Sequence, residues 1–174
     1  LNSLYGALGN RYFRFFDQRI AEAITLTGQL TIRWAEYALN TYLNRVLSKD
    51  KRKDYVVAID TDSLYVCLDD IVSKFNPESP IDFLDKVAND MLEPELAKSY
   101  EKLYEILGGV SNRMVMKREA IADRAIWTAK KRYILNMHDN EGVRYKRPKL
   151  KIMGIEAIKS STPEPCRDAL KALF

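Results

Sequence analysis

The sequence predicts an α+β protein, with an antiparallel sheet that carries an Asp-x-Asp hairpin and is flanked by long helices. Two observations support this fold class. Apolar residues recur at helical spacing through two long segments, and short β-branched or aromatic runs occur in pairs around turn signals. The 174 residues, 47% of them hydrophobic and 30% charged, suffice for one ordinary domain or for one piece of a larger protein.

The first predicted helix begins after Asp17, a residue that can cap a helix, and runs to Leu47. Gly28 is its weakest position, because glycine costs backbone entropy in a helix. Two short apolar runs, 55–59 and 64–68, follow and are separated by four polar residues. This pattern is typical of a β-hairpin.

A second helix is expected to begin at Ser79-Pro80 and to end at Gly108-Gly109, because Pro suits a first helical turn and Gly suits a helix end. Pro94 lies within it and is expected to break or kink it. The remaining signals predict two strands joined by a short turn, a further turn and a last helix, at 114–121, 127–137, 139–142 and from Thr162-Pro163 onward.

Composition excludes several classes of protein. The apolar runs are far shorter than the ~18–20 residues of a membrane-spanning helix, and no signal peptide is visible. Cys67 and Cys166 are too few for a disulfide scaffold, and His138 is the single histidine. We therefore expect no membrane association and a reducing cytoplasm. The chain lacks an initiator Met and both of its ends look cut, so we expect it to be a piece of a longer protein.

The basic residues are concentrated in one part of the chain. Residues 113–159 contain 13 Lys and Arg against 5 Asp and Glu, a net charge of +8, whereas the rest of the chain carries −4. Trp127, Tyr133 and Tyr145 are interleaved with this block. Such a pattern favours a polyanionic partner, although a solvated basic surface explains it equally well.

The strongest local motif is Asp60-Thr61-Asp62-Ser63, at the tip of the predicted hairpin. Two carboxylates two residues apart point the same way on a strand, and at a tight turn they can converge on a hard cation such as Mg²⁺. The alternative is an ordinary polar turn, since Asp and Ser are common turn formers.

Two further motifs are less specific by themselves. Asn2-Ser3-Leu4-Tyr5-Gly6 is also consistent with a helix end capped by glycine. Lys130-Lys131-Arg132-Tyr133, if it lies on a strand, places Lys131 and Tyr133 on one face and Lys130 and Arg132 on the other. One face could then contact a nucleic-acid duplex, whereas the alternative is a basic edge strand that prevents edge pairing.

The three motifs together, in this order and spacing, resemble family B DNA polymerases, and in particular the replicative polymerases of T-even-type phages. The resemblance covers essentially the whole chain. The connecting sequences that share it are Phe13-Arg14-Phe15-Phe16-Asp17, Ala23-Ile24-Thr25, Arg118-Glu119-Ala120-Ile121, Leu150-Lys151-Ile152-Met153-Gly154 and Ser160-Ser161-Thr162-Pro163.

The resemblance implies a division into the end of the fingers helix (1–8), the catalytic palm (9–159) and the start of the thumb (160–174). It implies that Asp60 and Asp62 are catalytic and bind metal, with Asp62 the more direct ligand. It places Glu119 near that site. The implied nucleotide-binding residues are Asn2, Tyr5 and Gly6, and the implied DNA-binding residues are Thr61, Ser63, Lys130, Lys131, Arg132 and Tyr133.

The implied chemistry is template-directed nucleotidyl transfer from a dNTP to a primer 3′-hydroxyl, with two Mg²⁺ ions in the complete enzyme. The implied partners are primer-template DNA, dNTP and the remaining polymerase domains, and the implied place is the host cell cytoplasm. The chain alone is expected to be inactive. It departs from the family at Ile59, where glycine is usual, and at Lys117, where phage relatives tend to carry an acid.

Three alternatives remain open. An apolar strand followed by Asp-x-Asp also begins haloacid-dehalogenase phosphatases, but these require Thr or Val at the position of Leu64 and a βαβ continuation. The second alternative is a palm that binds DNA without catalysis. The third is one subunit of a split polymerase, completed by a separate polypeptide.

Overall fold

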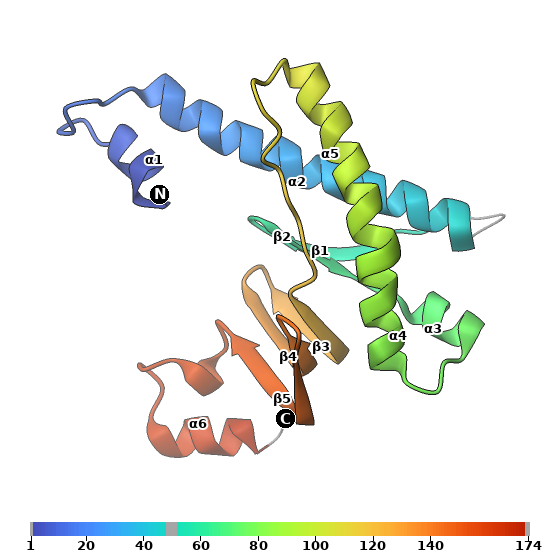
Figure 1. Cartoon of the computed structure of the whole chain (residues 1–174). Coiled ribbons are helices and arrows are strands. Elements are labelled where there is room, and N and C mark those ends of the chain that lie inside the picture. The colour runs from blue at the N-terminus through green and yellow to red at the C-terminus, as the bar shows by residue number, and fades with distance from the viewer. Residues whose placement is uncertain (1, 48–51, 173–174) are drawn as a thin grey trace. The chain divides into compact units, whose positions relative to one another are not determined.

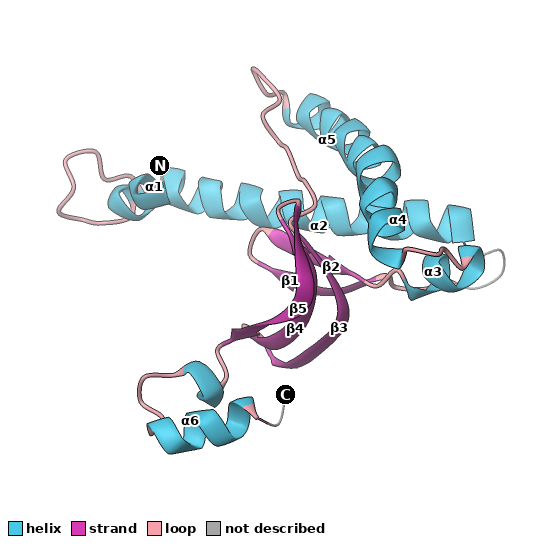
Figure 2. Ribbon diagram, turned by 60° about the horizontal axis from the view of Figure 1, so that its bottom comes forward, coloured by secondary structure: helices cyan, strands magenta, loops and turns pink. Residues whose placement is uncertain are grey.

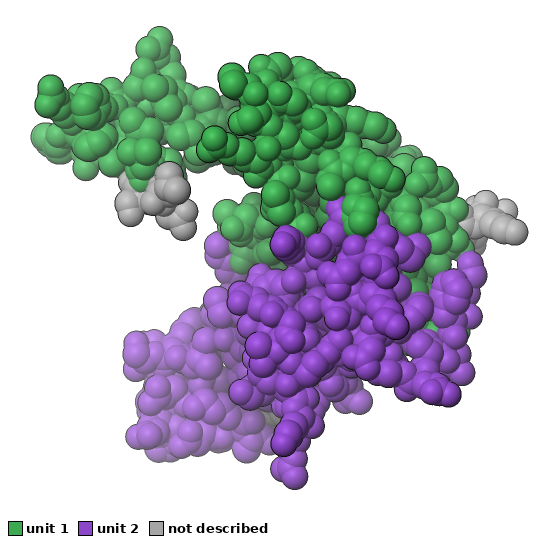
Figure 3. All heavy atoms as spheres, in the orientation of Figure 1, with its two compact units in different colours: residues 1–73, 94–116 green, residues 74–93, 117–174 purple. Residues whose placement is uncertain are grey.

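A computed structural model describes residues 2–47 and 52–172, without the side chains of residues 2 and 3. Its helices and antiparallel sheets confirm the predicted α+β class (Figures 1 and 2). The chain divides into two compact units. Unit 1 comprises residues 1–73 and 94–116, and unit 2 comprises residues 74–93 and 117–174 (Figure 3).

Unit 1 is built mainly from helices and one hairpin. Its elements are α1 (Asn2–Leu8), α2 (Gln18–Leu47), β1 (Val56–Asp60), β2 (Ser63–Val66), most of α3 (Asp69–Phe75) and all but the first residue of α5 (Glu93–Leu107). The predicted first helix is confirmed as α2, which continues through Gly28. The sequence pattern did not predict α3, whose first turn carries Asp69 and Asp70.

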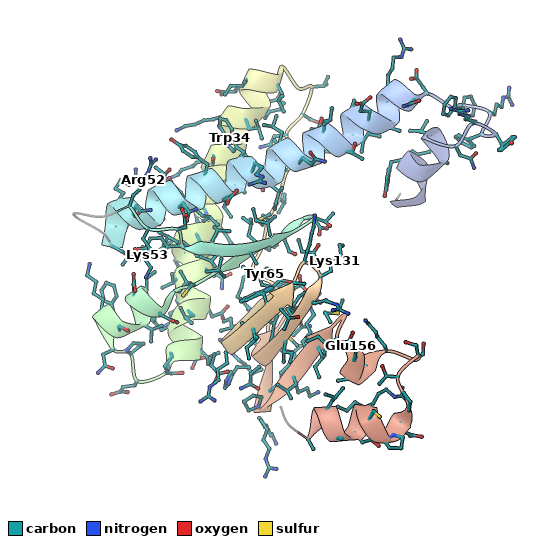
Figure 4. All side chains as sticks on the ribbon, turned by 180° about the vertical axis from the view of Figure 1, so that it is seen from behind. Trp34, Arg52, Lys53, Tyr65, Lys131 and Glu156 are labelled. Carbon is teal, nitrogen blue, oxygen red and sulfur yellow. The ribbon has the colours of Figure 1, made fainter. Side chains whose placement is uncertain are left out.

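The core of unit 1 lies along one face of α2. Its buried residues follow the helical spacing of three and four, at Ile32, Ala35, Leu39 and Leu43. Buried residues of α5 recur in the same way, at Leu96, Tyr100 and Leu103. The two helices are also joined by a hydrogen bond, in which Trp34 Nε1 donates to the Ser99 carbonyl at 2.9 Å (Trp34 is labelled in Figure 4).

Two asparagines one turn apart on α2 hold the chain as it enters β1. Asn40 Oδ1 accepts hydrogen bonds from the backbone N–H groups of Tyr55 (2.7 Å) and Val56 (3.2 Å). Asn44 accepts from the N–H of Lys53 at 2.8 Å and donates to its carbonyl at 2.7 Å. These amides satisfy backbone groups just before and at the first residue of β1 and so fix where the hairpin begins.

The predicted second helix differs from expectation at Pro94. Helical backbone runs through α4 (Pro80–Val87), the π-helical segment η1 (Ala88–Leu92) and α5, so Pro94 does not end it. Instead the helical hydrogen bonds change to a spacing of five residues just before the proline, where the Glu93 N–H bonds to the Ala88 carbonyl. A π-turn can accommodate a proline, because proline has no N–H to donate.

The expected end of this helix at Gly108-Gly109 is confirmed. Gly108 has a φ of +61°, and its N–H bonds to the Glu105 carbonyl at 3.1 Å. The Gly109 N–H bonds to the Tyr104 carbonyl at 3.2 Å. This paired arrangement is the Schellman motif, which requires a left-handed residue and therefore favours glycine.

Unit 2 is organised around a three-stranded antiparallel sheet. Its elements are α4, η1, β3 (Ala120–Ala129), β4 (Arg132–Asn140), β5 (Val143–Met153), the 3-10 helix η2 (Glu156–Ile158) and α6 (Glu164–Lys171), with strand order β3-β4-β5. The predicted turn at 139–142 and the predicted last helix are present. The predicted strand bounds 114–121 and 127–137 are wrong, because the turn between these strands lies at Lys130-Lys131. The sequence pattern missed β5, whose charged residues have low β-propensity.

A buried carboxylate organises the polar part of unit 2. Asp139, at 0% exposure, forms an ion pair with Arg118 and accepts a hydrogen bond from the Gly142 N–H at 3.0 Å. Arg118 also pairs with Asp85 of α4 at 2.8 Å, and Arg144 of β5 contacts Asp139 at 3.4 Å. A buried charge needs such partners, so this cluster fixes α4 against the sheet.

We expect Asn40→Ala to destabilise the chain by about 1–3 kcal/mol, because two backbone N–H groups lose their acceptor. The free energy of unfolding in urea measures this loss. Thr41→Ala is the matched control, since Thr41 is an exposed neighbour on α2 and its change should stay within about 0.5 kcal/mol. Equal losses for the two variants would contradict the role given to Asn40.

Candidate functional site

The aspartate motif lies at the tip of the β1–β2 hairpin in unit 1. Asp60 is the last residue of β1 and is paired with Ser63, the first residue of β2, so Thr61 and Asp62 form a two-residue turn. The Asp60 carbonyl accepts from the Asp62 N–H at 2.7 Å and from Ser63 Oγ at 3.0 Å. Thr61 has a φ of +55°, a left-handed conformation that is uncommon for a residue other than glycine.

This geometry corrects the strand argument for the two carboxylates. Asp60 ends a strand and Asp62 lies in the turn, so strand alternation does not decide where their side chains point. Asp60 is half-buried and accepts from Thr61 Oγ1 at 3.2 Å. Asp62 is exposed, and its carboxylate forms no ion pair or hydrogen bond with described residues. Asp62 therefore has the carboxylate that is more available to a ligand.

The donor set of the hairpin fits a hard divalent cation. Carboxylate oxygens are the ligands that Mg²⁺ prefers, and it usually binds through one or two of them while it keeps several waters. Within residues 2–47 and 52–172, no group of three or more His, Cys, Asp or Glu side chains is gathered as a metal site. Asp60 and Asp62 can thus contribute two ligands of such a site.

The hairpin also bears on the phosphatase alternative. Ile59 is paired with Leu64, and the two strands run antiparallel across a two-residue turn. A haloacid-dehalogenase phosphatase needs a helix and a parallel strand after its Asp-x-Asp, so this alternative is excluded. Ile59, the residue found in place of the family's glycine, is half-buried on β1.

The candidate nucleotide-binding residues lie in unit 1 on α1. Tyr5 is exposed to 48%, and α1 continues past Gly6 to Leu8, so Gly6 does not cap the helix as the alternative reading required. A Cβ built on Gly6 would have no neighbour within 4 Å. The side chain of Asn2 lies outside the described residues.

The basic motif occupies a hairpin turn in unit 2, which corrects the prediction that it lies on a strand. Ala129 is paired with Arg132, so Lys130 and Lys131 form the two-residue turn between β3 and β4. Lys131 has a φ of +61°. Only Arg132 and Tyr133 are strand residues, and Tyr133 is 5% exposed, with its ring centroid 6.4 Å from that of Trp127. The sequence pattern predicts a strand here because an apolar run flanks these charged residues.

The glycine that follows β5 packs against this turn. Gly154 has a φ of +65°, and a Cβ built there would collide with the Lys131 carbonyl oxygen. Both constraints favour glycine, because a side chain would be strained by the left-handed backbone and would also displace the turn. In the sequence, Gly154 stands directly after a basic segment, which indicates a turn. The sequence does not indicate that this glycine contacts Lys131.

Arg132 is engaged by an acid that the sequence reasoning did not single out. Arg132 Nη2 lies 2.6 Å from Glu156 Oε1, and Lys159 Nζ lies 2.8 Å from the same oxygen. The hydrogen bond from Lys159, with the charge of Arg132 beside it, lowers the pKa of Glu156 to about 2. Glu156 of η2 therefore holds Arg132 at the base of the basic turn (Lys131 and Glu156 are labelled in Figure 4).

Glu119, the candidate acid near the metal site, belongs to unit 2 and precedes β3. Its carboxylate is 56% exposed and lies 3.4 Å from Lys151 Nζ of β5. The neighbouring Lys117 is exposed, whereas Arg118 is turned into the buried cluster with Asp139. Of these two neighbouring residues, Arg118 therefore stabilises the fold, whereas Glu119 lies at the surface.

Comparison with known proteins identifies two relatives. The chain is 45% identical to a DNA-directed DNA polymerase of Escherichia phage RB69 and 40% identical to one of Enterobacteria phage T4. Each match extends over 98% of this chain and 20% of the relative, so the chain spans about a fifth of the length of these polymerases. No family model matches the chain. The resemblance to the replicative polymerases of T-even-type phages, which are family B enzymes, is confirmed.

We expect Gly154→Ala to destabilise the chain by about 1–3 kcal/mol, because it adds a Cβ to a left-handed residue against the Lys131 carbonyl. Gly28→Ala is the matched control. Gly28 lies inside α2 with nothing within 4 Å, so alanine should be neutral or stabilise by up to about 1 kcal/mol. Urea unfolding of both variants checks this, and a neutral Gly154→Ala would contradict the support given to the turn.

The lowered pKa of Glu156 predicts a specific acid sensitivity. The folded-state pKa of about 2 lies below the ordinary value of 4.5, so the ionised Glu156 stabilises the folded chain above about pH 4.5. This contribution is lost as the pH falls from 4.5 toward 2. Thermal melts of the wild type and of Glu156→Gln should therefore differ most above pH 4.5 and converge at lower pH. A constant difference from pH 6 to 2 would contradict the assignment.

Proposed function

We propose that this chain is the palm segment of a DNA-directed DNA polymerase and that it supplies the aspartate hairpin of the polymerase active site. The observation that carries the proposal is 45% and 40% identity to two phage DNA polymerases along 98% of the chain. The tight turn that presents an exposed Asp62 beside Asp60 supports it.

In this proposal the chain divides as the sequence resemblance implies. Residues 1–8 end the fingers helix and bring Asn2, Tyr5 and Gly6 to the incoming nucleotide. Residues 9–159 form the catalytic palm, and 160–174 lead into the thumb. The DNA contacts come from Thr61 and Ser63 of the hairpin and from the basic motif Lys130, Lys131, Arg132 and Tyr133.

The proposed reaction joins a primer 3′-hydroxyl to the α-phosphate of a dNTP and releases pyrophosphate. Bound Mg²⁺ would supply charge stabilisation to the attacking and leaving oxygens. Asp62 would be the direct protein ligand in this chain and Asp60 the second, with Glu119 as a nearby acid. The remaining groups position the substrates, which is most of the catalytic task when the chemistry itself needs little from the protein.

The relatives are about five times longer than the region they share with this chain. We therefore propose that activity requires the remaining polymerase domains, in the same polypeptide or as a second subunit. We propose the host cell cytoplasm as the place of this activity, because the relatives are phage polymerases. Among the described residues, no helix is long and apolar enough to cross a bilayer.

The decisive experiment places this chain in a complete polymerase. In a chimera, the 174 residues replace the matching segment of the phage RB69 polymerase, and primer extension is measured. We expect templated incorporation by the chimera, and a loss of about a hundredfold or more in Asp62→Asn, because a metal-binding charge is removed while volume is kept. Asp60→Asn should also lower the rate.

Asp54→Asn is the matched control, since Asp54 is an exposed acid six residues before Asp60. Its rate should equal that of the unaltered chimera. The 174-residue chain by itself should give no extension. A chimera that binds primer-template but extends nothing would favour the non-catalytic alternative, in which Ile59 or Lys117 has ended the activity. Full activity in Asp62→Asn would contradict the proposed site.

A further inference from the structure

The edge strand β5 contains a large bulge. Its residue Arg144 is paired with Asp139 of β4, and Lys149 is paired with Met137. Residues 145–148 therefore lie opposite the single residue His138, where a regular ladder would place one residue. The four residues, Tyr-Lys-Arg-Pro, leave the ladder, and Pro148 has no N–H to pair. Bulges of this kind re-aim side chains away from the sheet.

The two ends of the bulge contact each other. Lys149 Nζ lies 4.5 Å from the centroid of the half-buried Tyr145 ring, which is within the range of a cation–π interaction. This contact closes the bulge across four residues and leaves Lys146 and Arg147 exposed at its tip. A closed bulge holds two neighbouring cations in a limited region and so differs from a mobile charged loop.

The charge of unit 2 is divided unevenly between paired and unpaired cations. The acids of the basic block neutralise Arg118 and Arg144 through Asp139, Lys151 through Glu119, and Arg132 and Lys159 through Glu156. Lys146 and Arg147 form no ion pair with described residues, and the same holds for Lys130 at the hairpin turn. The cations at the turn and at the bulge therefore belong to the positive charge of residues 113–159 that no acid of the block neutralises.

We propose that the β5 bulge, through Lys146 and Arg147, is a second contact for the phosphate backbone of duplex DNA, separate from the hairpin turn of Lys130. This inference rests on the proposed polymerase function, which supplies the duplex. His138 is six residues along β4 from Arg132, which follows the turn, so the bulge and the turn are about 20 Å apart. That separation corresponds to about six base pairs of B-form DNA.

An ordinary explanation of the same residues makes the opposite prediction. Lys and Pro on an edge strand also prevent pairing with the edge of another sheet. In that role the two cations act on aggregation and contribute nothing specific to DNA binding. The salt dependence of binding separates the explanations, because each neutralised phosphate contributes about 0.9 to the slope of log affinity against log salt.

The experiment measures binding of the 174-residue chain to a fluorescent 20-base-pair duplex by anisotropy, between about 50 and 200 mM salt. We expect Lys146→Ala/Arg147→Ala to weaken binding and to lower the slope by about 1.8. The ratio of wild-type to variant affinity should then narrow roughly tenfold across this salt range. Lys98→Ala/Lys102→Ala on α5 is the matched control, because it removes the same charge from an exposed face outside the basic block. Its slope should equal that of the wild type.

Each other outcome overturns a defined part of the proposal. If the wild type binds and Lys130→Ala lowers the slope, but Lys146→Ala/Arg147→Ala does not, the bulge is not a DNA contact and the polymerase function stands. Equal losses in the bulge variant and the α5 control would indicate a diffuse charge effect and would also overturn the contact. No binding by the wild type would count against DNA as the partner of the whole chain. If the alanine variant melts early by circular dichroism, Lys146→Gln/Arg147→Gln replaces it.

Discussion

The aspartate hairpin depends on how two amide side chains of α2 hold the chain that enters it. Asn40 and Asn44 satisfy backbone groups of Lys53, Tyr55 and Val56, just before and at the start of β1. The side chain of Lys53 is fixed as well, since its ammonium group lies 2.7 Å from Asp70, whose hydrogen bond raises the pKa of Lys53. With β1 started at a defined residue, the register places Asp60 at a strand end and Asp62 in the turn.

Unit 2 uses charge in a different way. Its fully buried Asp139 needs Arg118 and Arg144 as partners, because an unpaired carboxylate in a protein interior costs several kcal/mol. Glu156 engages Arg132 and Lys159 in the same manner at the surface. The net charge of +8 in residues 113–159 is therefore not the charge that a ligand meets. A polyanion meets the cations that remain, among them those at the Lys130 turn and at the β5 bulge.

The two hairpin turns have the same backbone feature. Each is a two-residue turn that contains a left-handed residue other than glycine, Thr61 in one and Lys131 in the other. Glycine would be less strained at either position, but a flexible glycine would hold the flanking Asp62 or Lys130 less well. Gly154, distant in sequence, lies against the Lys131 carbonyl, where a Cβ would collide with it.

The sequence by itself determined the α+β class, the helix over residues 18–47, the aspartate turn and the likeness to phage polymerases, because periodicity, turn residues and motif spacing are local properties. Tertiary structure alone decided the rest. It placed Lys130-Lys131 in a turn, let a π-turn accommodate Pro94 and made the charged segment 143–153 a strand. The sequence also could not show which cations are neutralised. Arg118 contacts Asp139, and Arg132 contacts Glu156, only when residues more than 20 positions apart come together in the fold.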